Sequence, residues 1–105
     1  MITEIVTFDL PKEMTREQIL ANFRDSIPRW RDNPDMIRKH MIFDLEKRKA
    51  GGVYLWNSVT DAKRWHDDSF RDRVKTLFGG EPSYQYFETP VVVDNEASRV
   101  LDAAE

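Results

Sequence analysis

Short runs rich in apolar residues and separated by turn signals predict four strands. They cover residues 2–8, 36–44, 51–56 and 83–88, and a period of two is typical of half-buried strands. The polar run 46–49 separates the second strand from the third, so residues 36–56 are expected to form a hairpin with a long loop. Pro90 precedes a β-branched run, Val91-Val92-Val93, which is expected to be an extended arm that pairs with a sheet edge.

Two stretches with apolar residues three or four positions apart predict helices on either side of this hairpin. Thr15 and Gln18 resemble a capping box at the start of the first helix. Pro28 is expected to kink or end that helix. The second helix is expected over residues 58–78, where the polar triplet Asp67-Asp68-Ser69 can interrupt it. The order β-α-β-β-α-β predicts an α+β, ferredoxin-like fold with an antiparallel sheet.

The strand at residues 51–56, with the sequence Gly-Gly-Val-Tyr-Leu-Trp, is apolar on both faces. Successive side chains of a strand point to opposite sides of the sheet, so Val53 and Leu55 face one way and Tyr54 and Trp56 the other. A chain this short can cover one sheet face with its own helices and has little left for the second. The strand therefore predicts a homodimer through one sheet face, without saying which pair forms the interface.

Length and composition indicate one small globular domain. The chain has 105 residues, of which 40% are hydrophobic and 11% aromatic, which is enough for one modest core. A single ferredoxin-like α+β barrel domain is expected over residues 1–95. Residues 96–105 are polar and alanine-rich and are expected to fray.

Charge and residue usage exclude several function classes. The formal charge of −3, with acidic and basic residues interspersed, gives no basic footprint for nucleic acid. No signal peptide or membrane-spanning run is present, so a soluble cytoplasmic protein is expected. Without cysteine, metal-ligand spacing of histidines or a dinucleotide fingerprint, no metal and no organic cofactor is expected.

Two sequence elements resemble a known family. The strand Gly51–Trp56, which follows the Lys-bearing segment Ile37-Arg38-Lys39, and the ending Tyr86–Asn95 are similar to those of the YdhR-like mono-oxygenases. That family belongs to the dimeric α+β barrel superfamily, with the antibiotic-biosynthesis mono-oxygenases, and the resemblance covers roughly residues 1–95. It implies a homodimer with sheets packed face to face, and a pocket between each sheet and its helices. It also implies oxygenation of electron-rich aromatic substrates without metal, flavin or haem.

His66 and Lys39 are the candidate catalytic residues. His66 falls on the apolar face of the second helix, where an imidazole can relay protons near neutral pH. A core histidine that is bonded to a carbonyl is the alternative. Lys39 alternates with Ile37, Met41 and Phe43, and its cation could hold a phenolate or enolate. Alternatively, its stem lies on apolar surface while the ammonium reaches water.

Aromatic residues supply candidate walls for a substrate site. Trp30, Tyr54 and Trp65 are proposed to bind the substrate, although core and surface packing would use the same residues. His40 lies in the opposite strand phase from Lys39, so the two histidines are not expected to share a metal. The arginines of the first helix, Arg29 among them, are expected to form a solvated face.

These observations favour a cofactor-independent mono-oxygenase-like homodimer acting on a small aromatic or polyketide-like substrate. In that chemistry the protein deprotonates and orients the substrate, and the substrate anion supplies electrons to dioxygen. One alternative is a non-enzymatic, small-ligand-binding or stress-associated dimer of the same fold. An isomerase or a dehalogenase-type decomposition is a third.

Overall fold

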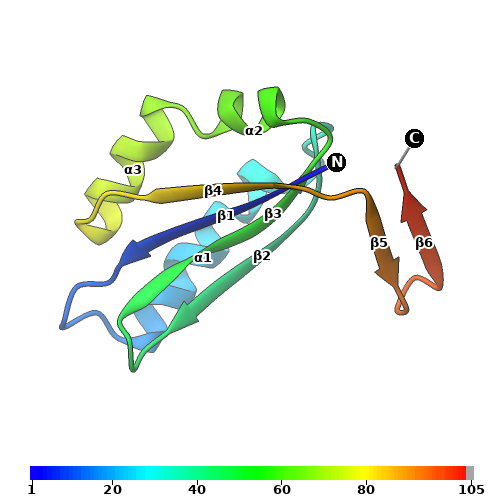
Figure 1. Ribbon diagram of the computed structural model, residues 1–105. Coiled ribbons are helices and arrows are strands. Elements are labelled where there is room, and N and C mark those ends of the chain that lie inside the picture. The colour runs from blue at the N-terminus through cyan, green and yellow to red at the C-terminus, as the bar shows by residue number, and fades with distance from the viewer. Residues whose placement is uncertain (104–105) are drawn as a thin grey trace.

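The computed structural model describes residues 1–103 and has the expected ferredoxin-like α+β fold (Figure 1). Four strands form one antiparallel sheet in the order β2-β3-β1-β4. Two further strands form a separate hairpin. The elements are, in chain order, β1 (Ile2–Asp9), α1 (Arg16–Trp30), β2 (Met36–Asp44), β3 (Lys49–Trp56), α2 (Val59–Trp65), α3 (Asp68–Phe78), β4 (Ser83–Glu88), β5 (Val91–Asp94) and β6 (Arg99–Asp102). Within residues 1–103 no helix is both long and apolar enough to cross a membrane.

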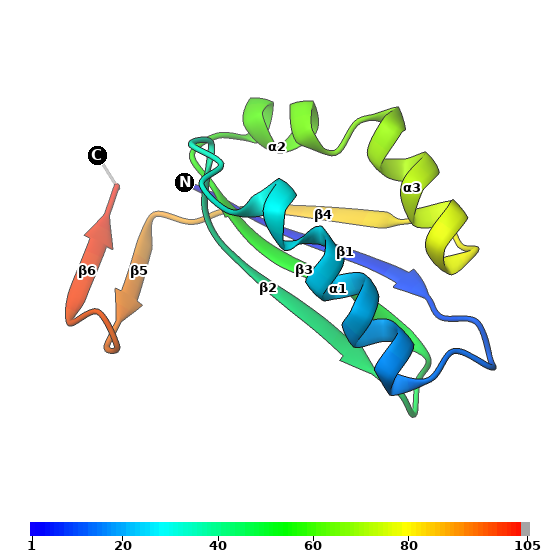
Figure 2. The same cartoon turned by 180° about the vertical axis from the view of Figure 1, so that it is seen from behind.

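All three helices lie against the same face of the sheet, as Figures 1 and 2 show from opposite sides. This arrangement decides which side of the two-faced strand points inward. Tyr54 and Trp56 are 2% and 0% exposed in the core beneath the helices. Val53 pairs with Ile5 of β1 and with His40 of β2, across the face that no helix covers. The open face is therefore the one that carries Val53 and Leu55.

Helix α1 begins as predicted but extends further than predicted. The capping box at Thr15 is present, with both of its hydrogen bonds to Gln18. Pro28 neither ends nor interrupts the helix, which continues to Trp30. The proline lies in the last turn of the helix, where the Arg31 amide donates a hydrogen bond to the Ile27 carbonyl at 2.9 Å. This extra turn places Trp30 in the core.

The second predicted helix is two helices, and the break falls at the polar triplet that was expected to interrupt it. His66 ends α2 with non-helical backbone angles, and Asp67 caps α3 by accepting a hydrogen bond from the Phe70 amide at 3.1 Å. Helix α3 then ends at Gly79, whose positive φ of 85° suits a residue without a Cβ. His66 therefore lies in a joint rather than within one continuous helix face.

A β-bulge alters the predicted phase of strand β2. The register shifts between Met36 and Arg38, so Ile37, which was expected to be in phase with Lys39, lies at this irregularity. From Lys39 onward the alternation is regular. Lys39 pairs with Tyr54, which directs the lysine to the helix-covered face, whereas the exposed His40 lies on the open face.

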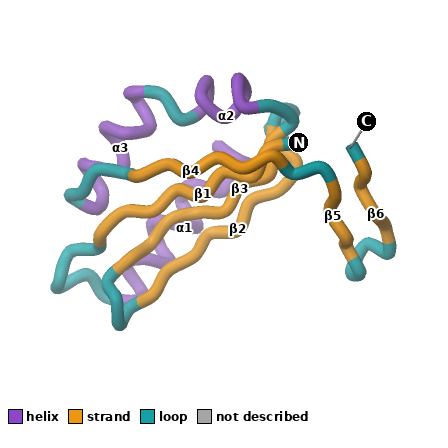
Figure 3. Tube along the Cα trace, viewed as in Figure 1, coloured by secondary structure: helices purple, strands orange, loops and turns teal. Residues whose placement is uncertain are grey.

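The C-terminal segment is more ordered than the frayed tail that was predicted from residue 96. Residues Arg99–Asp102 form β6, which pairs with β5 in an antiparallel hairpin that projects away from the main sheet (Figure 3). The Ala97 amide donates to Asp94 Oδ1 at 3.0 Å, and this bond supports the turn. Residues 104–105 of the predicted tail lie outside the described residues. The Val91–Val93 run is extended as predicted, but within this chain it pairs with β6 in a separate hairpin and not with an edge of the main sheet, because the chain turns back on itself at residues 95–98.

Candidate functional site

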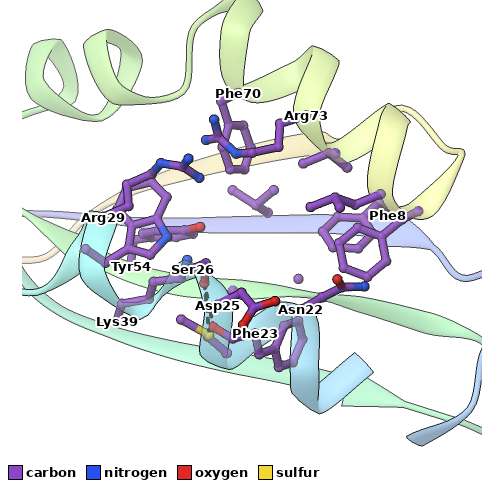
Figure 4. Close-up of a pocket in the computed structure, with 18 residues that line it drawn as sticks. Phe8, Asn22, Phe23, Asp25, Ser26, Arg29, Lys39, Tyr54, Phe70 and Arg73 are labelled. Atoms are coloured by element: carbon purple, nitrogen blue, oxygen red, sulfur yellow. Dashed lines mark hydrogen bonds between the residues drawn. The ribbon is translucent and has the colours of Figure 1, made fainter. Parts of the chain in front are cut away.

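A cavity of about 190 Å³ lies between the inner sheet face and helices α1 and α3 (Figure 4). Four elements supply its aromatic walls, with Phe8 from β1, Trp30 from α1, Tyr54 from β3 and Phe70 from α3. Gly52 also lines it, and a Cβ there would lie 2.8 Å from the Tyr54 ring, so glycine leaves room for that ring. The sequence analysis placed Trp30 and Tyr54 at a substrate site, and both line this cavity.

Lys39 enters the cavity from β2 and meets two aromatic faces. Its Nζ lies 4.1 Å from the centroid of the Trp30 ring and 4.5 Å from that of Tyr54, both within cation–π distance. Burial lowers the pKa of Lys39 to about 7, and the nearby positive charges of Arg29 and Arg73 act in the same direction. Among the described residues no carboxylate forms an ion pair with it. Near neutral pH this amine therefore exists both as a base and as a cation.

Two arginines complete the polar part of the cavity. Arg29 lies in the last turn of α1 and Arg73 on α3, and both line the cavity (Figure 4). Burial lowers the pKa of Arg73, and the charge of Arg29 adds to this. The sequence analysis assigned Arg29 to a solvated helix face and did not consider Arg73. Arg29 is exposed, but it also lines the cavity from the last turn of α1.

Behind the cavity, His66 and Glu4 form a buried pair. His66 Nδ1 lies 2.6 Å from Glu4 Oε1, and both side chains are fully buried. Trp56 Nε1 donates a hydrogen bond to the same oxygen at 2.9 Å. Sequence reasoning missed Glu4. The signal was a charged residue in phase with the apolar residues Val6 and Phe8 of its strand.

His66 and Lys39 do not open into one cavity. The His66 ring packs against Phe70 at 4.2 Å and against Tyr54 at 4.5 Å between ring centroids, and these two residues line the cavity whereas His66 does not. Burial raises the pKa of Tyr54 well above its usual value, and the negative charge of Glu4 adds to the rise. Tyr54 is therefore a neutral phenol between the lysine and the buried pair.

Trp65, the third expected wall, lies outside the cavity lining. Its indole Nε1 donates to Asp35 Oδ2 at 3.0 Å, and its ring is 6.4 Å from that of Trp30 between centroids. It therefore supports the outer side of a wall residue. In the part of the chain that the structure describes, no three His, Cys, Asp or Glu side chains are grouped so that they could hold a metal ion.

Comparison with known proteins identifies the fold class. No family model and no curated protein matches the chain. Among solved structures, the chain is similar to a mutant of SnoaB, a cofactor-independent oxygenase from Streptomyces nogalater, with a TM-score of 0.61 and 11% identity over 84% of this chain and 91% of that one. A candidate antibiotic biosynthesis mono-oxygenase from Deinococcus radiodurans gives a TM-score of 0.61 and 12% identity over 90% of this chain and 97% of that one.

A third similar structure is a dimeric ferredoxin-like protein from an uncultured marine organism, with a TM-score of 0.51 and 9% identity over 82% of this chain and 91% of that one. At such identities the likeness shows the fold alone. The chain has the ferredoxin-like α+β fold found in dimeric α+β barrel structures. Its closer relation to the YdhR-like family stays a prediction.

Proposed function

We propose that this protein is a cofactor-independent mono-oxygenase that oxidises a small, electron-rich aromatic substrate in the cavity beneath α1 and α3. The observation that carries the proposal is Lys39, a cavity amine that lies against the faces of Trp30 and Tyr54 and has no ion-pair partner among residues 1–103. The aromatic walls suit a flat apolar ring, and the polar side chains of the lining can fix its orientation. The solved structures of similar fold include an oxygenase that needs no cofactor.

The mechanism needs a base and then a cation at the same place. Neutral Lys39 takes the proton of a substrate hydroxyl, and the ammonium that forms then pairs with the substrate anion. This anion supplies the electrons to dioxygen. For a quinol, the ring gains one oxygen atom and becomes a hydroxyquinone, while two hydrogens leave with the second oxygen atom as water. His66 lies behind Tyr54, so its proposed role is that of a relay or positioning group.

Oxygen uptake by the wild-type protein tests the proposal. With quinols and electron-rich phenols, we expect uptake above that of heat-denatured protein. With ¹⁸O₂, one labelled atom should appear in the product and one in water. Hydrogen peroxide formed in place of labelled product would indicate an oxidase. If none of these compounds supports uptake, the oxygenase proposal fails and the ligand-binding alternative takes its place.

We also propose that the open sheet face forms a homodimer. Ile5, Val53 and Leu55 lie on it, with the exposed residues Ile42 and Phe87 near its edges. The hairpin carries two further exposed apolar residues, Val93 and Val100, which are 67% and 60% exposed. Single exposed apolar residues are common on protein surfaces, whereas several of them on one sheet face are typical of an interaction site.

A charge at the centre of this face is expected to separate the protomers. In light scattering, the wild type should have the mass of a dimer at micromolar concentration. Val53→Glu should give a monomer or an insoluble chain, because a stable interface buries roughly 1,600 Å² in total and an unpaired charge in it is costly. Thr60→Glu, at an exposed site on α2, is the matched control and should remain dimeric. A monomeric wild type would rule out the interface.

A further inference from the structure

The cavity gathers positive charge in a chain that is negative overall. Arg29, Lys39 and Arg73 reach it from three different elements, and Asp25 is the one acidic residue of its lining. The chain as a whole carries a formal charge of −3. The cluster therefore does not follow from a basic composition, and it forms only where α1, β2 and α3 meet.

The two arginines of this cluster lack the ion pairs that other arginines of the chain make. Arg38, Arg64 and Arg71 each lie within 4.0 Å of a carboxylate oxygen. Among the described residues no such pair involves Arg29 or Arg73. The charge of Arg29 makes that of Arg73 less favourable, and both arginines do the same to the charge of Lys39. An anion between the two guanidinium groups would relieve this repulsion.

The size of the cavity limits the rest of the ligand. An apolar cavity of about 150 Å³ is large enough to hold benzene, whereas drug-sized ligands occupy about 300–1,000 Å³. At about 190 Å³, this cavity fits one aromatic ring with small substituents. The rings of Trp30, Tyr54 and Phe70 provide apolar surface for it.

We infer that the pocket binds a single-ring aromatic carboxylate whose carboxylate is held by Arg29 and Arg73 and whose ring lies against Trp30 and Tyr54. This inference rests on the proposed function and names its substrate class. The planar guanidinium fork matches a carboxylate in two-point contact, which an ammonium cannot do. Lys39 is then left free to act on a ring hydroxyl. Of the small aromatic and polyketide-like substrates that the sequence analysis expects, the cavity volume of about 190 Å³ favours the single-ring compounds.

Binding of two matched compounds tests the charge requirement. Calorimetry without oxygen compares 2,5-dihydroxybenzoate with 2,5-dihydroxybenzamide, which has the same ring and nearly the same size but no charge. We expect the benzoate to bind at least about tenfold more tightly. Arg29→Gln and Arg73→Gln should each weaken benzoate binding about tenfold and leave benzamide binding unchanged. Arg24→Gln, on the same helix as Arg29 but outside the cavity lining, should change neither affinity.

Ring number tests the size requirement. Anthracene-9-carboxylate carries the same charge on three rings, and it should bind at least about tenfold more weakly than 2,5-dihydroxybenzoate. Melting curves of the arginine variants confirm that they are folded before binding is compared. The inference is overturned if benzamide binds as well as benzoate, if both arginine variants bind benzoate like the wild type, or if the three-ring acid binds as tightly as benzoate.

Oxygen uptake separates this inference from the proposed function. If the dihydroxybenzoate binds as expected but no compound is oxidised, the carboxylate site stands and the oxygenase proposal fails. If the dihydroxybenzamide is oxidised with the same kcat/KM as the dihydroxybenzoate, the oxygenase proposal stands and the carboxylate site is overturned.

Discussion

Replacing His66 with alanine is expected to lower the free energy of unfolding by about 2–5 kcal/mol, because it removes a fully buried ring from the core. The substitution removes the imidazole that lies 2.6 Å from the buried Glu4 carboxylate and leaves that carboxylate with the Trp56 indole N–H and the Tyr86 hydroxyl as donors. Denaturant unfolding measures the loss. Arg24→Ala, at an exposed position of α1, is the control and should change stability by less than about 0.5 kcal/mol.

A second substitution shows whether the buried charge is the cause. In the His66→Ala background, Glu4→Gln removes the charge and keeps an oxygen that accepts from Trp56. The double variant should therefore be more stable than His66→Ala alone. If His66→Ala costs less than about 1 kcal/mol and the dimer mass is kept, while turnover falls roughly 10²–10⁴-fold, His66 is a catalytic relay rather than a structural residue.

Lys39→Met is expected to reduce kcat/KM roughly 10²–10⁴-fold, the usual effect of losing a general base. Lys39→Arg keeps the positive charge but cannot be deprotonated. If Lys39 is the base, arginine should not restore activity, whereas a residue that only stabilises an anion would be replaced by arginine with little loss. The wild-type kcat/KM should rise with pH through about 7 as the amine loses its proton, and Lys39→Met should lack this rise. Unchanged activity in Lys39→Met would show that the cavity is not the active site.

The same variant should be more stable than the wild type. The folded-state pKa of Lys39 is about 7, below the ordinary value of 10.5, so between these values the unfolded chain binds more protons than the folded one. Stability therefore rises with pH across this window, and the cost of burying the cation is fully present below pH 7. Lys39→Met should raise the melting temperature more at pH 6 than at pH 9. Equal shifts at both pH values would contradict the lowered pKa.

The fold class could be predicted from sequence because its signals are local. Alternation with a period of two at residues 83–88, the capping box at Thr15 and the polar triplet after His66 each act over a few residues, and each appears where it was expected. The errors also have local causes. Pro28 lies close enough to the end of α1 to be tolerated, and the hairpin of β5 and β6 forms because Val92 and Val93 find partners in Leu101 and Val100.

The sequence by itself determined the order of the elements, the two-faced strand and which residues of one strand share a face, but not which of these faces points inward. Only the tertiary structure decided which residues from different elements lie together around the cavity or behind it. Glu4 and His66 are far apart in the chain, and so are Arg29 and Arg73, and their distances depend on how β1, α1 and the two helices after β3 pack together. Periodicity assigns a side chain to a face of its own element. It carries no information about which other element covers that face, because packing between elements is a long-range property.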